Sequence, residues 1–361
     1  MGTPSQFNCS TVDDTISFVY MNSFNCTNET DDSLNSTFRL PLLVRTLQAM
    51  TYIFLLIFGL SLNVFLICLI LCRNSLHQRG FVVAIQILLT NVAFTIPVLS
   101  TSTHVALAGD WTLGDGSCQF IAFCHQSFQP QRWLLTAVLV IDRTLTVNRP
   151  LKYEKHGAKF VAIMSTVALV AGLLVGILPP SVLHTCNGYL PGVNTCHFTN
   201  SHRGCGVYVV SYSTVILVLG GVLPFGLYIW MFCKAKKASR QIIPTHHMRL
   251  STAPSHLSTS RKQITTVFLL FWTLLGCLLP HYFAFLLAYL SIVFGSIKAL
   301  IAGYYGLILT QPLYYGLVIA DPIALMWHKD VKKELKKIKH TIRNILGTYL
   351  KVTTSPSPST T

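Results

Sequence analysis

Long apolar stretches, separated by short polar segments, recur along most of this chain. Crossing a hydrocarbon core of about 30 Å takes about 20 residues of helix. The stretches of that length are 47–71, 81–108, 118–141, 160–183, 207–233, 264–290 and 299–327. Arg132 interrupts the third stretch and Asp321 the seventh. The pattern predicts an all-α membrane protein, a seven-transmembrane helix bundle.

The polar segments between these stretches differ in charge. Lysine and arginine gather within 72–80, 142–159 and 234–262 and again from residue 329 onward. Because cytoplasmic loops are enriched in these residues, the segments are predicted to face the cytoplasm, which places the N-terminus outside. The first 40 residues agree, since they carry acceptor patterns for N-glycosylation at Asn8, Asn25, Asn28 and Asn35.

A second kind of periodicity follows the last apolar stretch. Apolar residues recur at steps of four and three, with lysines between them, at Val331, Leu335, Ile338, Ile342 and Ile345. Such a pattern predicts an amphipathic cytoplasmic helix that lies on the membrane and is attracted by anionic lipid. The predicted organisation is an extracellular tail over 1–40, a bundle over 41–328, a surface helix over 329–346 and a disordered tail over 347–361.

Composition supports a membrane location and limits the meaning of the charge. The chain is 52% hydrophobic and 11% charged, with a mean hydropathy of +0.54, which is unlike a water-soluble domain. Its net charge of +15 would suggest nucleic acid in a soluble protein. Here the charge lies in cytoplasmic segments, where it can face membrane lipid, so we expect no nucleic-acid binding.

Polar residues share one face of the third predicted helix. His125, Arg132 and Arg143 are separated by seven and eleven positions, which places them on one helical face together with Gln129 and Thr136. A charge at bilayer depth costs roughly 2.5 to 3.5 kcal/mol unless it is paired or wetted. We therefore expect Arg132 to pair with Asp321; the alternative is a water-filled pocket with no specific partner.

Motifs spread over several predicted helices resemble those of the rhodopsin-like family of G-protein-coupled receptors, over residues 47–346. They are Asn63 in GLSLNV, Trp111, Gly114 and Cys118 in WTLGDGSC, the Asp142–Arg143 pair, RPLKY at 149–153, Pro179, Pro224, CLLP at 277–280 and DPIAL at 321–325. No single motif is specific, but their order and spacing together are.

The resemblance implies a cell-surface receptor that binds an extracellular ligand in the bundle and activates a heterotrimeric G protein. The candidates for ligand contact are His125, Gln129, His281, Tyr282, Tyr314 and Tyr315. Each can equally be a packing residue. His125 stands where amine receptors have Asp, and Tyr315 where opsins have the retinal-binding Lys, so an amine and retinal are both disfavoured. The residues implied in G-protein coupling are Asp142, Arg143, Pro150 and Leu151.

The resemblance also implies an intramembrane polar site and a disulfide. In the family, the positions in helices two, three and seven that match Asn91, Arg132 and Asp321 hold a sodium ion. We expect the Arg132 guanidinium to replace that ion and to hydrogen-bond Asn91, and we assign Asn63 of the first helix to the same polar site. Cys118 is expected to bridge to the second outer loop, where Cys186, Cys196 and Cys205 offer three choices and Cys196 is the closest match.

Other expectations concern partners and chemistry. Serine and threonine in the third inner loop and the tail favour phosphorylation by receptor kinases and recruitment of arrestin-like partners at the plasma membrane. The histidine pair at 246–247 has no acidic neighbour, so we expect no enzyme, metal site or cofactor.

The sequence departs from the family pattern at residues tied to activation. These are Thr144, Phe232, Leu278 and Leu325. They leave open a receptor-like protein without G-protein signalling. A membrane transporter is a further alternative, although no internal repeat is apparent.

Overall fold

The computed structural model describes residues 40–354, apart from 78, 149, 183–186, 191, 199–210, 212–213, 216, 231–232, 234–252 and 294–296. The predicted glycosylation sites Asn8, Asn25, Asn28 and Asn35 lie outside the described residues. So do Cys186 and Cys205, two of the three candidates for the disulfide.

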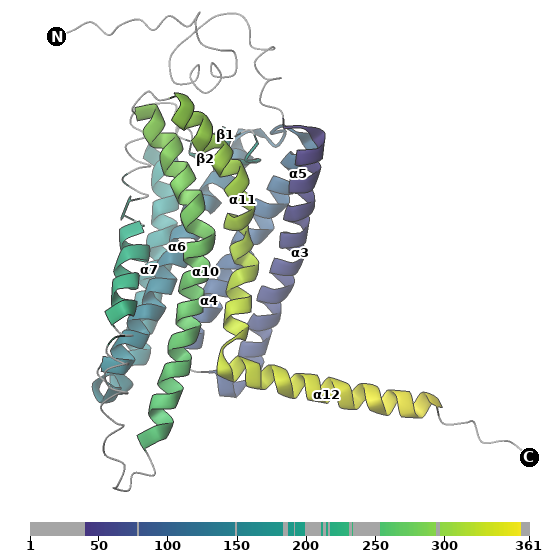
Figure 1. Cartoon of the computed structure of the whole chain (residues 1–361), viewed down its shortest axis with the longest axis vertical. Helices are drawn as coiled ribbons and strands as arrows, with labels where there is room; N and C mark the ends of the chain where they lie inside the picture. Colours follow the sequence, from purple (N-terminus) through teal and green to yellow (C-terminus); the bar gives the residue numbers. More distant parts are fainter. Residues whose placement is uncertain are drawn as a thin grey trace, which may run out of the picture.

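Long helices lying side by side form most of the structure (Figure 1). They are α3 (Leu42–Cys72), α4 (Arg79–Phe94), α5 (Ser100–Ala108), α6 (Gly114–Asn148), α7 (Pro150–Val182), α10 (Ala253–Val293) and α11 (Ile297–Met326). A π-helical segment, Thr95–Leu99, joins α4 to α5, and another covers Leu217–Val222. A hairpin of β1 (Asn187–Leu190) and β2 (Thr195–Phe198) lies at one end of the bundle, and α12 (Lys329–Thr354) leaves it at the other. We call these the hairpin end and the α12 end.

In the described part of the chain, five helical segments are long and apolar enough to cross a membrane. They are Leu42–Cys72, Gly80–Ala108, His156–Ile177, Phe268–Ala288 and Ala302–Met326. The third predicted stretch lies in α6, whose polar side chains, such as Gln126 and Arg132, are buried inside the bundle. An average over all positions therefore understates how apolar the outer face of α6 is. Parts of the fifth predicted stretch lie outside the described residues, and the apolar helix within it, Leu217–Trp230, is shorter than these five.

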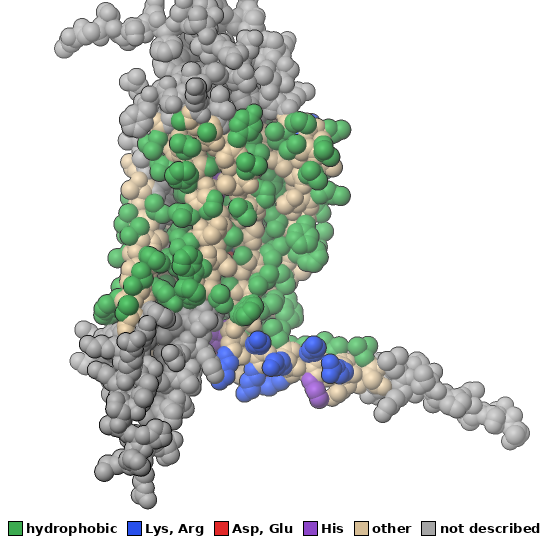
Figure 2. Space-filling model, viewed as in Figure 1, with side chains coloured by type: hydrophobic (Ala, Val, Ile, Leu, Met, Phe, Trp, Pro, Cys, Tyr) green, Lys and Arg blue, Asp and Glu red, His purple; other side chains and the backbone are tan. Residues whose placement is uncertain are grey.

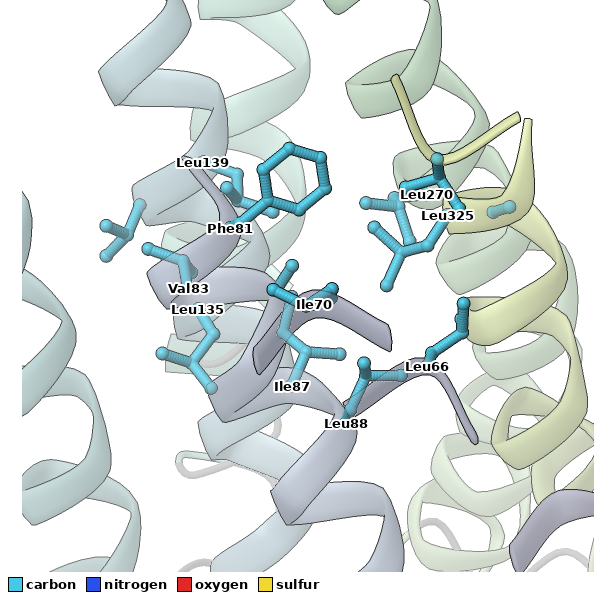
Figure 3. Close-up of a cluster of buried hydrophobic side chains, with 14 of the residues drawn as sticks. Leu66, Ile70, Phe81, Val83, Ile87, Leu88, Leu135, Leu139, Leu270 and Leu325 are labelled. Atoms are coloured by element: carbon cyan, nitrogen blue, oxygen red, sulfur yellow. The ribbon is translucent and has the colours of Figure 1, made fainter. Parts of the chain in front are cut away.

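The inner faces of the helices form two large apolar clusters, and a smaller one joins the start of α6 to β2 around Cys118 and Cys196. The cluster near the α12 end joins α3, α4, α6, α10 and α11 through residues such as Leu66, Phe81, Leu139, Leu270 and Leu325 (Figure 3). The cluster near the hairpin end includes Tyr52, Phe94, Trp133, Leu278 and Tyr315. Arg132 and Asp321 lie between the two along α6 and α11, so a polar layer separates the two halves of the core.

Large apolar side chains also cover the outside of the bundle. Phe54, Ile57 and Phe58 of α3 are each more than half exposed, and Figure 2 shows hydrophobic side chains over much of the visible face. Exposure on this scale is unfavourable in water but favourable against lipid tails. Lysine and arginine side chains instead gather along α12.

Two expectations from sequence are corrected. The hairpin adds a small antiparallel sheet to a chain predicted to be all-α, with Tyr189 opposite Cys196. The helix predicted over 329–346 continues to Thr354.

Candidate functional site

A buried ion pair joins α6 to α11 at the middle of the bundle. Arg132 Nη2 lies 2.8 Å from Asp321 Oδ2, and the two side chains are 4% and 5% exposed. The predicted pairing is therefore present in the structure. Each of these buried charges is stabilised by the other, since a lone buried charge costs several kcal/mol.

Two asparagines extend this pair towards α3. Asn91 Nδ2 donates to Asp321 Oδ2 and to Asn63 Oδ1, at 3.1 Å each. Asn63 Nδ2 in turn donates to the carbonyls of Gly59 and Val318 at 2.7 Å. The expected hydrogen bond from Arg132 to Asn91 is wrong: both side chains donate to Asp321 Oδ2 instead, because the carboxylate is the stronger acceptor. The four predicted polar residues nevertheless form one connected network.

A second polar cluster lies towards the hairpin end. His125 Nδ1 is 2.9 Å from the Tyr314 hydroxyl, which donates to Gln129 Oε1 at 3.1 Å. The His281 ring stacks on Tyr314 with centroids 4.6 Å apart. We call His125, Gln129, His281 and Tyr314 the histidine–tyrosine cluster; all four are buried.

The hydrogen bonds of this cluster determine where its protons lie. The Tyr314 hydroxyl has one proton and donates it in a hydrogen bond to Gln129 Oε1. Its oxygen must therefore accept the hydrogen bond from His125 Nδ1–H. His125 Nε2 then accepts from the Thr195 hydroxyl, 2.9 Å away. A directed chain of donors therefore runs from the hairpin through His125 and Tyr314 to Gln129.

The other two candidates for ligand contact border this cluster, with the Tyr315 ring 5.2 Å from that of Tyr314, but their further contacts lie outside it. The Tyr315 hydroxyl lies 3.1 Å from Ser102 Oγ, and its ring packs edge-on against Tyr52. Tyr282 packs edge-on against Trp133, with centroids 6.2 Å apart. The structure thus brings four of the six predicted residues into one cluster and places Tyr315 and Tyr282 beside it.

The hairpin was not anticipated from the sequence, and it covers the cluster. The predicted disulfide joins Cys118 to Cys196 and fixes β2 to the start of α6. Asn187 Oδ1 accepts from Gln126 Nε2 at 2.7 Å. The dipeptide Pro191–Gly192 is a turn signal that could have indicated the hairpin, and Gly192 adopts a φ of 76°, which favours glycine.

Histidine is also present on the hairpin itself. His197 lies against His125, with ring centroids 5.3 Å apart, and against Phe285 at 5.0 Å. Burial lowers the pKa of His197 to about 4, because a charged imidazole is poorly solvated there. At neutral pH this face of the hairpin is therefore polar but uncharged.

A second site lies at the α12 end of α6. Arg143 Nε is 3.3 Å from Asp142 Oδ2, and the Asp142 side chain is almost fully buried. The Arg143 guanidinium occupies the place that a Cβ on Gly80 would take. Gly80 therefore allows Arg143 to lie against the start of α4. Pro150 begins α7, but its side chain and that of Leu151 are outside the described residues.

The first turns of α12 are fixed to the bundle near this site. Glu334 is 3% exposed and accepts from Lys337 Nζ at 2.7 Å and from Ser75 Oγ at 3.1 Å. Arg73 Nε lies 3.7 Å from the same carboxylate. These donors, Lys337 first, lower the pKa of Glu334. No group of three His, Cys, Asp or Glu residues suited to a metal ion occurs in the described segments.

Comparison with known proteins gives a consistent result. Residues 62–323 match the 7 transmembrane receptor (rhodopsin family). The Dopamine D2-like receptor of Drosophila melanogaster is 24% identical over 186 residues, which are 51% of this chain and 20% of that protein. G-protein coupled receptor 183 of Rattus norvegicus is 21% identical over 251 residues, 66% of this chain and 65% of that receptor. The matches therefore span less than two thirds of the length of either relative.

Proposed function

Since the chain belongs to the rhodopsin family of G-protein-coupled receptors, we propose that it binds an extracellular ligand in the bundle and activates a heterotrimeric G protein. The family is one of receptors rather than enzymes. The proposal includes the full set of seven spans, with α6 as the third and the region around Leu217–Trp230 as the fifth. It places the hairpin end and the glycosylated tail outside the plasma membrane.

One observation carries the coupling part of this proposal. Arg143 is paired with Asp142 and lies against Gly80 at the α12 end, where the lysines of α12 also gather. The family resemblance assigns this Asp–Arg pair to the inactive state and a released Arg143 to contact with the G protein. Pro150 and Leu151, which follow in the same inner loop, belong to the same proposed contact.

At the hairpin end, the histidine–tyrosine cluster is the proposed ligand site. His125 replaces the carboxylate that binds amines in related receptors, so the similarity to a dopamine receptor does not extend to an amine ligand. Tyr282 and Tyr315 flank the cluster and complete the proposed set of contacts.

The Arg132–Asp321 pair is proposed to take the place of a bound sodium ion. The guanidinium supplies a permanent cation next to the carboxylate, and the Asn91 amide supplies a further donor to it. A site that already holds a tethered cation has less need of a second carboxylate, which fits an asparagine at position 91.

Partners on the inner side complete the proposal. The first turn of α12 places Lys332 over the Trp327 ring, 5.6 Å from its centroid, which suits a helix lying on anionic lipid. Serine and threonine in the inner loop and tail are proposed targets of receptor kinases, with arrestin as the resulting partner.

The test of signalling is ligand-free G-protein activation in cells, measured across the main G-protein classes. The intact chain is compared with Arg143→Ala at matched surface expression. Activity that disappears in the variant supports the proposal. Equal activity in both, in every class, would overturn it.

A further inference from the structure

His125 is the central residue of the proposed ligand site, and both of its ring nitrogens already form hydrogen bonds within the chain. Its Nε2 accepts from Thr195 on the hairpin and its Nδ1 donates to Tyr314, both at 2.9 Å. The ring of His197, on the same hairpin, lies tilted against that of His125 with centroids 5.3 Å apart. With 1% of its surface exposed, His125 has no ring nitrogen left for a ligand.

The hairpin is held in this position from several sides. Its disulfide fixes it to α6, and Asn187 binds Gln126 and Gln119 of the same helix. On the opposite side, Gln48 of α3 donates to the carbonyl of Gly192 and accepts from Asn194 at 2.9 Å. Thr195 is consequently 2% exposed and is a packed part of the bundle.

The structure with the hairpin in place also has the Asp142–Arg143 pair formed. We infer that the β1–β2 hairpin is the resident ligand of the histidine–tyrosine cluster and that it holds the receptor in its silent conformation. Thr195 and His197 already make the contacts with His125 that a diffusible ligand would make. An external ligand therefore acts by displacing the hairpin. This inference rests on the proposed function, because it names the occupant of the same site.

The first test asks whether the hairpin covers the cluster and does not depend on signalling. The full-length chain carrying Gln129→Cys is exposed on intact cells to a charged thiol reagent that does not cross membranes. Gln129 lies one helical turn from His125, on the side away from the hairpin. The new cysteine is therefore protected from the reagent while the hairpin is in place. Adding Thr195→Val and His197→Ala removes that protection.

A matched position controls for expression and for the native cysteines. Leu113→Cys, at an exposed site before α6, is labelled equally with either hairpin, and the parent chain gives the background. Labelling of Gln129→Cys with the native hairpin, or protection that survives both hairpin substitutions, would overturn the inference.

The second test asks what the hairpin does to signalling. Thr195→Val removes the donor to His125 Nε2 and so weakens the binding of the hairpin to the histidine–tyrosine cluster. Ligand-free G-protein activation should rise about five-fold at matched expression. Thr112→Val is the matched control, because Thr112 makes a similar bond of 3.1 Å to His104, but on the exposed surface. It leaves activation unchanged.

Activation that is unchanged or lower in Thr195→Val overturns the resident-ligand inference when Arg143→Ala abolishes signalling in the same assay. If the parent, Thr195→Val and Arg143→Ala all signal equally, the proposed coupling fails instead. The labelling of Gln129→Cys then still decides whether the hairpin occupies the cluster.

Discussion

Arg132 of α6 and Asp321 of α11 lie 189 residues apart in sequence and form an ion pair of 2.8 Å in the core of the bundle. The pair separates the two apolar clusters and, through Asn91, reaches α3. One contact therefore connects α6 and α11, the two helices that also contribute His125 and Tyr314 to the proposed ligand site.

Loss of either partner is expected to destabilise the chain. Arg132→Ala or Asp321→Ala leaves the other charge buried and unpaired, which costs about 3–5 kcal/mol. The Tm of the purified full chain in lipid nanodiscs should fall in both variants. Arg73→Ala, which breaks the half-exposed pair with Glu334, should cost less than about 1 kcal/mol.

The charge-swapped double variant, Arg132→Asp with Asp321→Arg, tests the pairing itself. It should recover part of the Tm and surface expression lost by the single variants, because the opposite charges meet again. A double variant no better than the worse single would show that the two residues act independently.

Gly80 is expected to control the position of Arg143. Gly80→Ala places a methyl group where the guanidinium lies, so the flexible end of the Arg143 side chain must move away from α4. Ligand-free signalling should rise accordingly. Gly276→Ala, with nothing within 4 Å of the added carbon, should have no effect. Unchanged signalling in both variants would show that Gly80 does not control the position of Arg143.

Sodium is expected not to affect the native chain. Replacing sodium by choline at constant ionic strength should leave ligand-free signalling unchanged, because Arg132 already supplies the cation beside Asp321. Arg132→Ser frees the carboxylate for an ion that prefers oxygen ligands, so the variant should become sodium-dependent. Sodium dependence in the native chain would contradict the tethered-cation account.

The attachment of α12 should depend on acid pH. The pKa of Glu334 lies below its ordinary value of 4.5 in the folded chain. A depressed carboxyl pKa adds stability that is complete above 4.5 and is lost as the pH falls through the lower folded value. A spin label at Lys333 should therefore report α12 release only below about pH 4.5.

The matched variant for that measurement is Glu334→Gln. It removes the titrating group while keeping the shape, so its spin-label signal should not change with pH in this range. Release of α12 at the same pH in both variants would mean that another group is responsible.

Much of the site could be predicted from the periodic spacing of polar residues in α6. The spacing of His125, Gln129, Arg132 and Thr136 placed them on one inward face, and all four are buried. The opposite signs of Arg132 and Asp321 were enough to predict their pairing, because a charge in hydrocarbon requires a partner. Cys196 was favoured by resemblance, and the structure confirms its bond to Cys118.

The contacts of the hairpin could not be predicted in the same way. Its strands are four residues each, too short for a clear alternating pattern. The bond from Thr195 to His125 spans 70 residues and depends on where the disulfide places β2. The direction of the Asn91 amide was likewise decided by the nearest strong acceptor, which only the packed helices define.

The most direct measurement of the central claim is nucleotide exchange on purified G proteins. The full-length chain in nanodiscs should accelerate GTP-analogue binding by at least one class of heterotrimer, and Arg143→Ala at equal concentration should not. Acceleration by neither protein in any class, or equal acceleration by both, would contradict the account of this chain as a receptor that signals through Arg143.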